Sequence, residues 1–213
     1  MGVKAAFFDF DGTLRRGDSI VGYMAYALKK RRMRLTDIFA AAGAGILYAL
    51  KLLPVEKLKT RCLRFEKRMD EETLDAFARG FVNDRLIPTL LPDGLSQWRR
   101  YKAEGALTVL ASASTEEYMR PLADALGADA LICTGIRDHR VQRNCRGREK
   151  ADRIRAWAAH RRVPLKDCAA YGNSRGDLDM LALVGSPHVI DPGRRTRKAA
   201  GEKGYPVTSW KRK

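Results

Sequence analysis

Two carboxylates follow the first apolar stretch of the chain and are the clearest candidates for chemistry. Residues 3–8 are apolar apart from one lysine, which predicts a buried strand, and Asp9, Asp11 and Gly12 come directly after it. Because residues i and i+2 of an extended chain point to the same side, we expect Asp9 and Asp11 to project together from the carboxyl end of the strand. Parallel sheets bind their ligands at this end.

Two neighbouring carboxylates repel each other, so they stay together only when one is protonated or a cation lies between them. A Mg²⁺ ion together with a phosphate group would satisfy this condition. One aspartate would then attack phosphorus, and the other would handle the proton of the leaving oxygen. The alternative is a solvated Asp-Gly turn after a strand, in which neither carboxylate takes part in a reaction.

A serine follows the apolar residues 106–111, which are expected to form a second buried strand. The hydroxyl of Ser112 and the backbone N–H groups of Ala113 and Gly12 are candidates to bind phosphate oxygens. Ser114, two residues further on, is expected to cap the following helix instead.

Lys150 lies in the first turn of a helix expected at residues 149–160. The amino end of a helix disfavours a cation unless an anion faces it, so this position favours a functional lysine. Asn173 and Asp177 follow a third expected strand at residues 168–171, and their side-chain oxygens would meet the two N-terminal aspartates at the same sheet edge. Taken alone, this run of Gly, Asn and Asp is an ordinary turn.

The elements that position these residues alternate between strand and helix after residue 92. Besides the three strands already described, strands are expected at 130–133 and 188–190, and helices at 95–104, 116–126, 149–160 and 178–183. Such alternation predicts an α/β fold, with a Rossmann-like three-layer core in which helices cover both faces of a parallel sheet. The first strand belongs to the same sheet.

From Asp18 to about Pro92 the periodicity is helical throughout, which predicts an all-helical insertion after the first strand. Four helices are expected, at residues 20–28 with Ser19 as cap, from residue 36 or 37 to Leu53, at 54–68, and from Asp70 onward. We expect this insertion to form a cap domain over the carboxyl edge of the sheet. The expected domains are therefore a core of residues 1–16 and 93–213 and a cap of residues 17–92.

The composition is that of a globular protein with a strong basic balance. The chain has 213 residues, 45% of them hydrophobic, which is enough for one sizeable core and a small appended domain. With 41 Lys+Arg against 25 Asp+Glu the formal net charge is +16, which favours anionic partners. Few aromatic residues are interleaved with the basic clusters, so nucleic acid is not expected. The four cysteines are widely spaced, which predicts reduced thiols and no structural zinc.

The ends of the chain and its apolar stretches predict a cytoplasmic protein. The first strand begins so close to Met1 that no signal peptide is expected. The longest nearly uncharged run, residues 38–50, is 13 residues long, whereas roughly 20 are needed to span a bilayer. Trp210 and the basic residues after it are expected to form a frayed end.

Taken together and in this order, the four polar segments resemble the haloacid dehalogenase phosphohydrolases over almost the whole chain. These segments are an Asp-x-Asp-Gly-Thr sequence, a strand ending in serine, a downstream lysine and a Gly-Asn-Ser-x-x-Asp sequence. The helical insertion between the first two segments is similar to that of the phosphoserine-phosphatase-like branch. The resemblance implies a Mg²⁺-dependent phosphomonoesterase that works through an aspartyl-phosphate.

The resemblance also implies a role for each matching residue. Asp9 matches the nucleophile, and Asp11 matches the general acid that protonates the leaving group and then activates water. Mg²⁺ would bind the side chain of Asp9, the backbone carbonyl of Asp11 and a group in the last segment. Ser112 would donate a hydrogen bond to the phosphoryl group, and Lys150 would offset its charge.

Two positions depart from the family pattern or allow two interpretations. Asn173 stands where the family usually has a metal-binding aspartate, and an amide oxygen contributes no negative charge. Metal affinity is therefore expected to be lower unless Asp177 compensates. Asp18 matches an acid that meets the amino group of the substrate in the phosphoserine enzymes, or it caps the helix that follows it.

The cap composition leaves two kinds of substrate open. Its apolar helix lies between the basic residues 29–34 and Lys51, and this arrangement also suits a helix on an anionic bilayer. Similar enzymes of this branch with an apolar cap helix act on phosphatidylglycerophosphate. We therefore expect a small or amphiphilic phosphomonoester, phosphoserine-like or lipid-linked, and peripheral contact with the inner membrane surface. The alternative is that residues 38–53 pack against the other cap helices or a second subunit.

A second class of function is a catalytically weak protein on the same scaffold. Its basic surface would bind an anionic partner, either a membrane or nucleic acid, and Asn173 would weaken its metal site. The presence of Asp9, Asp11, Ser112 and Lys150 together favours the enzyme, because a protein that only binds gains nothing from two carboxylates at one edge.

Overall fold

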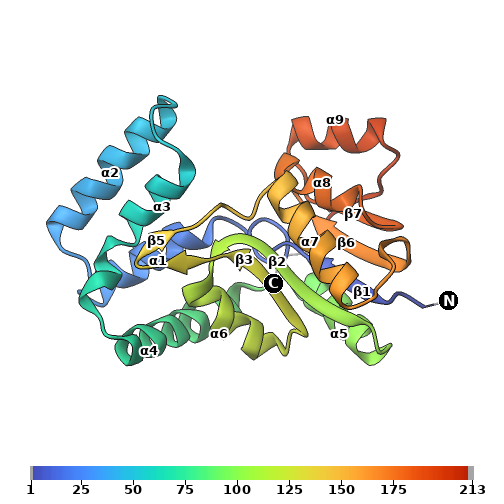
Figure 1. Cartoon of the computed structure of the whole chain (residues 1–213), viewed down its shortest axis with the longest axis horizontal. Coiled ribbons are helices and arrows are strands. Elements are labelled where there is room, and N and C mark those ends of the chain that lie inside the picture. Colours follow the sequence, from blue (N-terminus) through green and yellow to red (C-terminus); the bar gives the residue numbers. More distant parts are fainter. Residues whose placement is uncertain (1, 211–213) are drawn as a thin grey trace.

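A computed structural model describes residues 2–210 of the chain, and its central feature is a six-stranded parallel sheet (Figure 1). The strands are β1 (Ala5–Phe8), β2 (Leu107–Thr115), β3 (Ala130–Thr134), β6 (Cys168–Gly172), β7 (Ser186–Ile190) and β8 (Val207–Thr208). Their order in the sheet is β3-β2-β1-β6-β7-β8, and every neighbouring pair is parallel. β1 therefore lies between β2 and β6, and the carboxyl ends of these three strands meet at one edge.

Helices cover both faces of this sheet. One face is covered by α5 (Pro92–Ala103) and α6 (Glu116–Leu126), and the other by α7 (Arg148–His160), α8 (Leu178–Leu181) and α9 (Arg194–Glu202). Because successive strand residues alternate in direction, Ala6 and Phe8 of β1 enter the first core. Ala5 and Phe7 enter the second, and all four side chains are fully buried. This three-layer arrangement confirms the predicted α/β, Rossmann-like fold class.

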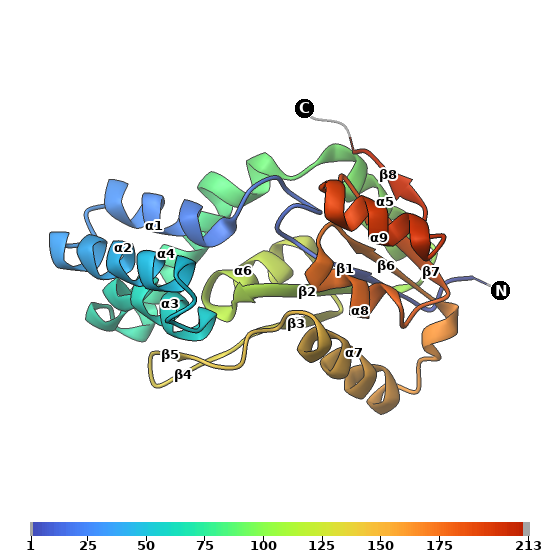
Figure 2. The same ribbon diagram turned by 90° about the horizontal axis from the view of Figure 1, so that it is seen from above.

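The part of the chain between β1 and α5 is helical, as predicted, and lies to one side of the sheet (Figure 1). It contains α1 (Ser19–Lys29), α2 (Leu35–Ala49), α3 (Val55–Cys62) and α4 (Glu71–Phe81), with short helical turns at Arg64–Arg68, Val82–Leu86 and Ile87–Thr89. We call residues 17–92 the cap, and this boundary stays a prediction. α4 packs against α6, and α3 packs against an unpredicted hairpin of β4 (Ile136–Arg137) and β5 (Arg140–Val141), which extends from the core toward the cap (Figure 2).

Two of the expected cap helices end earlier than the sequence indicated. The helix expected to reach Leu53 ends at Ala49, where the chain turns so that α3 packs beside α2. The helix expected over residues 54–68 ends at Cys62, and a 3₁₀ turn follows it. That turn places Phe65 in the cap core, where its side chain is fully buried. Burial of this ring outweighs the local preference for a continuous helix.

The C-terminal region is ordered and packed, which the sequence analysis did not predict. α9 and the edge strand β8 follow β7, the last strand that the sequence predicted. The prediction that Trp210 belongs to a frayed end is wrong, because its side chain is 5% exposed and its ring lies 5.7 Å from that of Tyr171. Trp210 also contacts Gly94 so closely that a Cβ there would be 2.7 Å from the indole. The rest of the expected frayed end, residues 211–213, lies outside the described residues.

No helix in the part of the chain described here, residues 2–210, is long and apolar enough to cross a membrane. This agrees with the short uncharged run in the sequence.

Two glutamates face each other where the cap meets the core. Glu66 of the cap is 4% exposed, and Glu117 lies in the first turn of α6. One oxygen of each carboxyl is buried without a hydrogen-bond partner among the described residues. Burial raises the pKa of Glu117 to about 7, and burial together with the charge of Glu117 raises the pKa of Glu66 well above its ordinary value. Both carboxyls are therefore held in their neutral form in acid.

Stability should consequently fall as the pH rises. The folded protein binds more protons than the unfolded chain between the ordinary glutamate pKa of 4.5 and about 7. The stabilisation of the folded protein by the two neutral carboxyls is complete below pH 4.5 and is lost as the pH rises through about 7. In Glu117→Gln the fall in melting temperature from pH 5 to pH 8 should be smaller, and the variant should be more stable at pH 8 by about 1–2 kcal/mol.

The matched control is Glu72→Gln, at an exposed position of α4. It should keep the wild-type dependence of melting temperature on pH. Equal slopes for Glu117→Gln and the wild type would contradict the assignment of this pH dependence to the buried pair.

Candidate active site

The chain leaves the sheet at Asp9 and turns sharply, so Asp9 and Asp11 are not neighbours on one strand face as predicted. β1 ends at Phe8, and the Asp9 N–H still donates to the Tyr171 carbonyl of β6 at 2.9 Å. The next residues form a tight turn in which the N–H groups of Thr13 and Arg15 both donate to the Phe10 carbonyl. The strand prediction was right to place both carboxylates at this edge, but the turn sets their orientation.

A cavity of about 460 Å³ lies at this edge of the sheet, walled on one side by the cap. All nine residues that the sequence analysis singled out as catalytic, phosphate-binding or metal-binding line it: Asp9, Asp11, Gly12, Asp18, Ser112, Ala113, Lys150, Asn173 and Asp177. They come from the ends of β1, β2 and β6, from the first turn of α7 and from the start of the cap. The structure therefore brings every predicted site residue to one place.

A buried lysine holds two of the carboxylates. Lys150 Nζ donates to Asp9 Oδ1 and to Asp177 Oδ1, each at 2.7 Å, and its side chain is 1% exposed. Burial alone would lower the pKa of Lys150, but the two carboxylates outweigh burial and raise it. The two carboxylates therefore favour the charged ammonium form of Lys150.

The two carboxylates on Lys150 differ in their remaining partners. Burial raises the pKa of Asp177, but Lys150 and the Ser174 hydroxyl and N–H outweigh burial and hold it below its ordinary value. Asp9 has Thr13 Oγ1 at 3.0 Å on its other oxygen, and burial followed by the charge of Asp177 raises its pKa to about 7. Both oxygens of Asp177 thus accept hydrogen bonds, from Lys150 and from Ser174, whereas burial and the charge of Asp177 leave the charged form of Asp9 less well stabilised.

Asp11 is held by residues of both the cap and the core. Ser19, at the start of α1, donates to it from its N–H at 2.9 Å and from its hydroxyl at 2.6 Å. Ser114 Oγ donates at 2.7 Å, and Arg15 forms an ion pair with it at 3.1 Å. Burial raises the pKa of Asp11, and the two serine hydroxyls oppose that rise. The contacts of Asp11 therefore connect the cap to the carboxyl edge of the sheet.

Neither Ser19 nor Ser114 caps a helix as predicted. Ser19 was expected to cap α1, but Asp18 is the N-cap and accepts from the Ile20 N–H at 3.1 Å. Ser114 was expected to cap α6, but Thr115 is the N-cap residue. A two-residue irregularity in the pairing of β2 with β3 lets the strand continue to Thr115 and turns Ser114 toward Asp11. Both serines are thereby free to hold the carboxylate.

The phosphate-binding candidates lie on this irregular part of β2. The Ser112 hydroxyl accepts from the Ser114 N–H at 3.0 Å, which leaves its own proton available to a ligand. Lys59 of α3 reaches across from the cap and donates to the Ala113 carbonyl at 2.6 Å and to Asn144 Oδ1 at 2.7 Å. Burial lowers the pKa of Lys59. This lysine was missed in the sequence analysis, because nothing near it in sequence indicates a site.

The arrangement fits a divalent cation at the sheet edge. Asp9 is an incompletely neutralised carboxylate, and Asp11 and Asn173 line the same cavity. Gly12 has a left-handed backbone (φ 84°), and a Cβ on it would lie only 1.9 Å from the Asn173 amide nitrogen. The Asn173 side chain therefore occupies the space that a larger residue at position 12 would fill. Oxygen ligands of this kind suit Mg²⁺.

Comparisons with known proteins agree with this geometry. A family model for haloacid dehalogenase-like hydrolases matches residues 6–182. The chain is 31% identical over 218 residues to "Probable phosphatase Rv3661" of Mycobacterium tuberculosis, an alignment that covers 98% of this chain and 76% of that protein. It is 28% identical to the phosphoserine phosphatase SerB1 of the same species, with 97% of this chain and 71% of that protein covered.

A solved structure of a protein of unknown function from Bordetella pertussis has the same fold. Its TM-score is 0.85 at 24% sequence identity, and the superposition covers 97% of this chain and 98% of that one. Together these findings confirm the resemblance that was predicted from the four sequence segments.

The close approach of the Asn173 side chain to Gly12 allows a test of the expected metal site. Ala at position 12 should displace the Asn173 side chain, so Gly12→Ala is expected to lower Mg²⁺ affinity at least tenfold, as measured by calorimetry. Gly17→Ala is the matched control, because Gly17 has a similar backbone (φ 80°) and a Cβ on it would have nothing within 4 Å. Both variants should lose about 1 kcal/mol of stability to backbone strain. Equal Mg²⁺ affinity in the two variants would exclude Asn173 as a ligand.

Proposed function

The chain belongs to the haloacid dehalogenase-like hydrolases and is a phosphatase of that family, and we propose that it hydrolyses phosphomonoesters through a covalent phosphate on Asp9. One observation supports this most directly: the buried Asp9 carboxylate lies at the carboxyl end of β1, fixed by Lys150 and Thr13, and faces a cavity that also holds Asp11 and Ser112. A nucleophile, a general acid and a phosphate-binding hydroxyl are thus within one site.

The proposed reaction has two steps. In the first, an oxygen of Asp9 attacks phosphorus, the bond from phosphorus to the ester oxygen breaks, and Asp11 gives that oxygen a proton. In the second, Asp11 takes a proton from a water molecule whose oxygen attacks phosphorus. The bond from phosphorus to Asp9 then breaks, and free phosphate is released.

Several groups would bind the phosphoryl oxygens during both steps. Ser112 would donate its free hydroxyl proton, and the backbone N–H of Ala113 lies at the same cavity. The Gly12 N–H was also predicted to bind phosphate, but it donates to the Arg15 carbonyl at 2.7 Å instead. Lys150 is in contact with Asp9 and would offset the negative charge that gathers there. Asp9, the Asp11 carbonyl and Asn173 would hold Mg²⁺, which when bound adds positive charge beside the nucleophile and the phosphoryl group.

We propose a small or amphiphilic phosphomonoester as substrate, because the cavity wall formed by the cap is both apolar and charged. Ile20, Val55 and Leu58 present apolar side chains, whereas Lys59 is cationic, and Arg146 of the core adds a second cation to the cavity. Asp18 is an exposed carboxylate at the same wall and would meet an ammonium group if the substrate carries one, as phosphoserine does. A lipid-linked substrate such as phosphatidylglycerophosphate would instead place its apolar part against the three aliphatic residues.

We place the protein in the cytoplasm, with the cap in peripheral contact with an anionic membrane surface. A lipid-linked substrate would require such contact, and the net charge of +16 favours it. The second candidate function, an anion-binding protein with weak catalysis, depends on Asn173 at the metal site. The test of turnover and Mg²⁺ binding separates the two.

Asp9→Asn should abolish turnover while leaving the fold intact. We expect phosphate release by the wild type to require Mg²⁺ and to stop with EDTA, and the variant to fall by at least a thousandfold, because the amide is a poor nucleophile. Phosphate release is measured on phosphoserine, sugar phosphates, nucleotides and short-chain phosphatidylglycerophosphate. Asp75→Asn, on the exposed side of α4, is the control that should keep full activity.

The results of this assay distinguish the two candidate functions. Turnover that survives in Asp9→Asn would refute the covalent mechanism. A wild type that is folded but releases no phosphate and binds no Mg²⁺ would favour the anion-binding protein instead.

Ser19→Ala should lower kcat through Asp11 and leave KM nearly unchanged. The variant removes the hydroxyl that donates to the carboxylate, while the backbone N–H of residue 19 remains. We expect kcat to fall about tenfold to a hundredfold, and the limb of the pH profile that Asp11 governs to move to higher pH, because hydrogen bonds to a carboxylate lower its pKa. Ser209→Ala, beside Asp191, is the control. An unmoved pH profile would show that Ser19 acts only in folding.

A further inference from the structure

Helix α2 has two unlike faces. Its buried residues, Asp37, Ala41 and Ala44, lie toward the rest of the cap. Leu35, Phe39, Ile46 and Leu50 share the opposite side, because their spacing of about four and seven residues repeats with the helical period. We call these four residues the outer face of α2.

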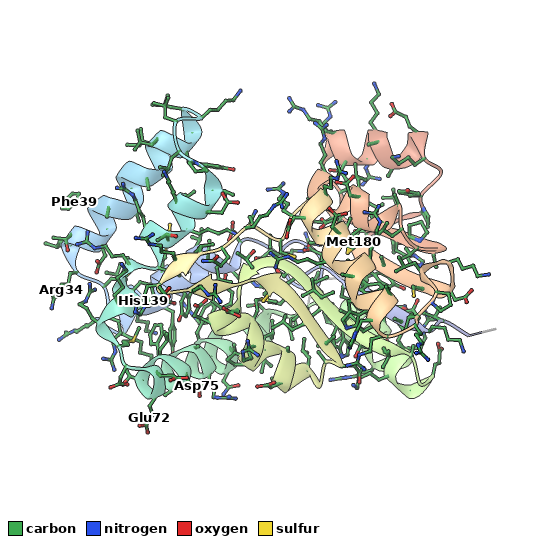
Figure 3. All side chains as sticks on the ribbon, viewed as in Figure 1. Arg34, Phe39, Glu72, Asp75, His139 and Met180 are labelled. Carbon is green, nitrogen blue, oxygen red and sulfur yellow. The ribbon has the colours of Figure 1, made fainter. Side chains whose placement is uncertain are left out.

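The outer face is exposed to solvent. Its four side chains are 72%, 73%, 62% and 62% exposed in chain order, and Leu52 just beyond the helix is 70% exposed. Figure 3 shows Phe39 at the outer edge of the molecule, pointing away from the cap and the core. Single apolar side chains are common on protein surfaces, but a continuous row of this kind marks an interaction site. The alternative that residues 38–53 pack against the other cap helices holds for the inner side of α2, which packs against α3, whereas the side chains of the outer face stay exposed.

Cations flank α2 in the sequence, and no acid lies on its outer face. Lys29 at the end of α1, Arg31 and Arg34 in the loop before α2, and Lys51 after the helix are all exposed. Lys29, Arg31 and Lys51 form no ion pair within residues 2–210. The only acid of α2 is Asp37, which is fully buried and paired with Arg68. The helix thus combines an apolar row with unpaired positive charge at both ends.

We propose that the outer face of α2 docks on an anionic phospholipid bilayer, with the helix lying in the plane of the interface. The four apolar side chains would enter the boundary between headgroups and acyl chains, and the flanking lysines and arginines would contact the lipid phosphates. This proposal names the surface through which the protein would meet the membrane. It rests on the proposed function for the identity of the membrane-linked substrate.

A second copy of the chain is a poorer occupant for this face. A symmetric pairing of two outer faces would bring the same cationic borders of two chains, each with a formal charge of +16, against one another. An anionic bilayer is complementary to those borders instead. The helix is also too short to cross a membrane, so it would lie on the surface.

Docking in this orientation leaves the catalytic cavity accessible. Tyr48 projects from the side of α2 opposite the outer face and lines the cavity. The cavity wall would therefore lie one helix thickness from the bilayer, about 10 Å. A phosphomonoester held in the membrane could reach the site around the end of α2, where the exposed side chain of Leu52 lies.

Flotation with vesicles tests the proposal. The full chain is mixed with vesicles of phosphatidylglycerol and phosphatidylethanolamine, or of phosphatidylcholine alone, at low and high salt. We expect binding to the anionic vesicles only, weaker at high salt, and at least tenfold weaker for Phe39→Glu and for Ile46→Glu. Val207→Glu, an equal change on the distant edge strand β8, should bind like the wild type.

Three results would overturn the proposal. These are no binding of the wild type to anionic vesicles, equal binding to phosphatidylcholine, and wild-type binding by both α2 variants. A dimer in light scattering that Phe39→Glu converts to a monomer would assign the face to a second copy. Circular dichroism checks that each variant is folded. Because vesicle binding is measured without substrate, its failure is distinguishable from a failure of phosphate release.

Discussion

The contact of Lys150 with Asp9 and Asp177 is the constraint on which the rest of the structure depends. A buried ammonium group is costly unless carboxylates surround it, and here two of them do so at 2.7 Å. The three residues come from the end of β1, the start of α7 and the turn after β6. They can meet only if β1 and β6 are neighbouring parallel strands and α7 begins at the same edge.

The cap covers the carboxyl edge of the sheet and also contributes side chains to the site. Ser19 of α1 binds Asp11, and Lys59 of α3 binds the Ala113 carbonyl, so two cap helices contribute directly to the geometry of the site. The aromatic ring of Tyr23 packs on Tyr118 of α6 and ties the cap core to the sheet. Opening the cap would therefore remove the Ser19 contacts from Asp11 as well as admit substrate.

The two sides of the cap carry different kinds of side chain. Toward the sheet it gives hydroxyl, ammonium and aliphatic groups, which suit a phosphate with a mixed apolar and polar remainder. Away from the sheet, α2 gives an apolar row bordered by cations. Both properties support the proposal that the enzyme takes an amphiphilic phosphate from an anionic surface.

The sequence by itself determined the fold class and every residue proposed for the reaction, because strand and helix periods are local and parallel strands bring their carboxyl ends to one edge. Only the tertiary structure decided which serines hold Asp11, since serines that cap helices and serines that bind ligands look alike in sequence. Ser19 and Ser114 are 95 residues apart and meet at 2.8 Å. The sequence likewise left the outer face of α2 open, because an amphipathic pattern does not specify what covers the apolar side.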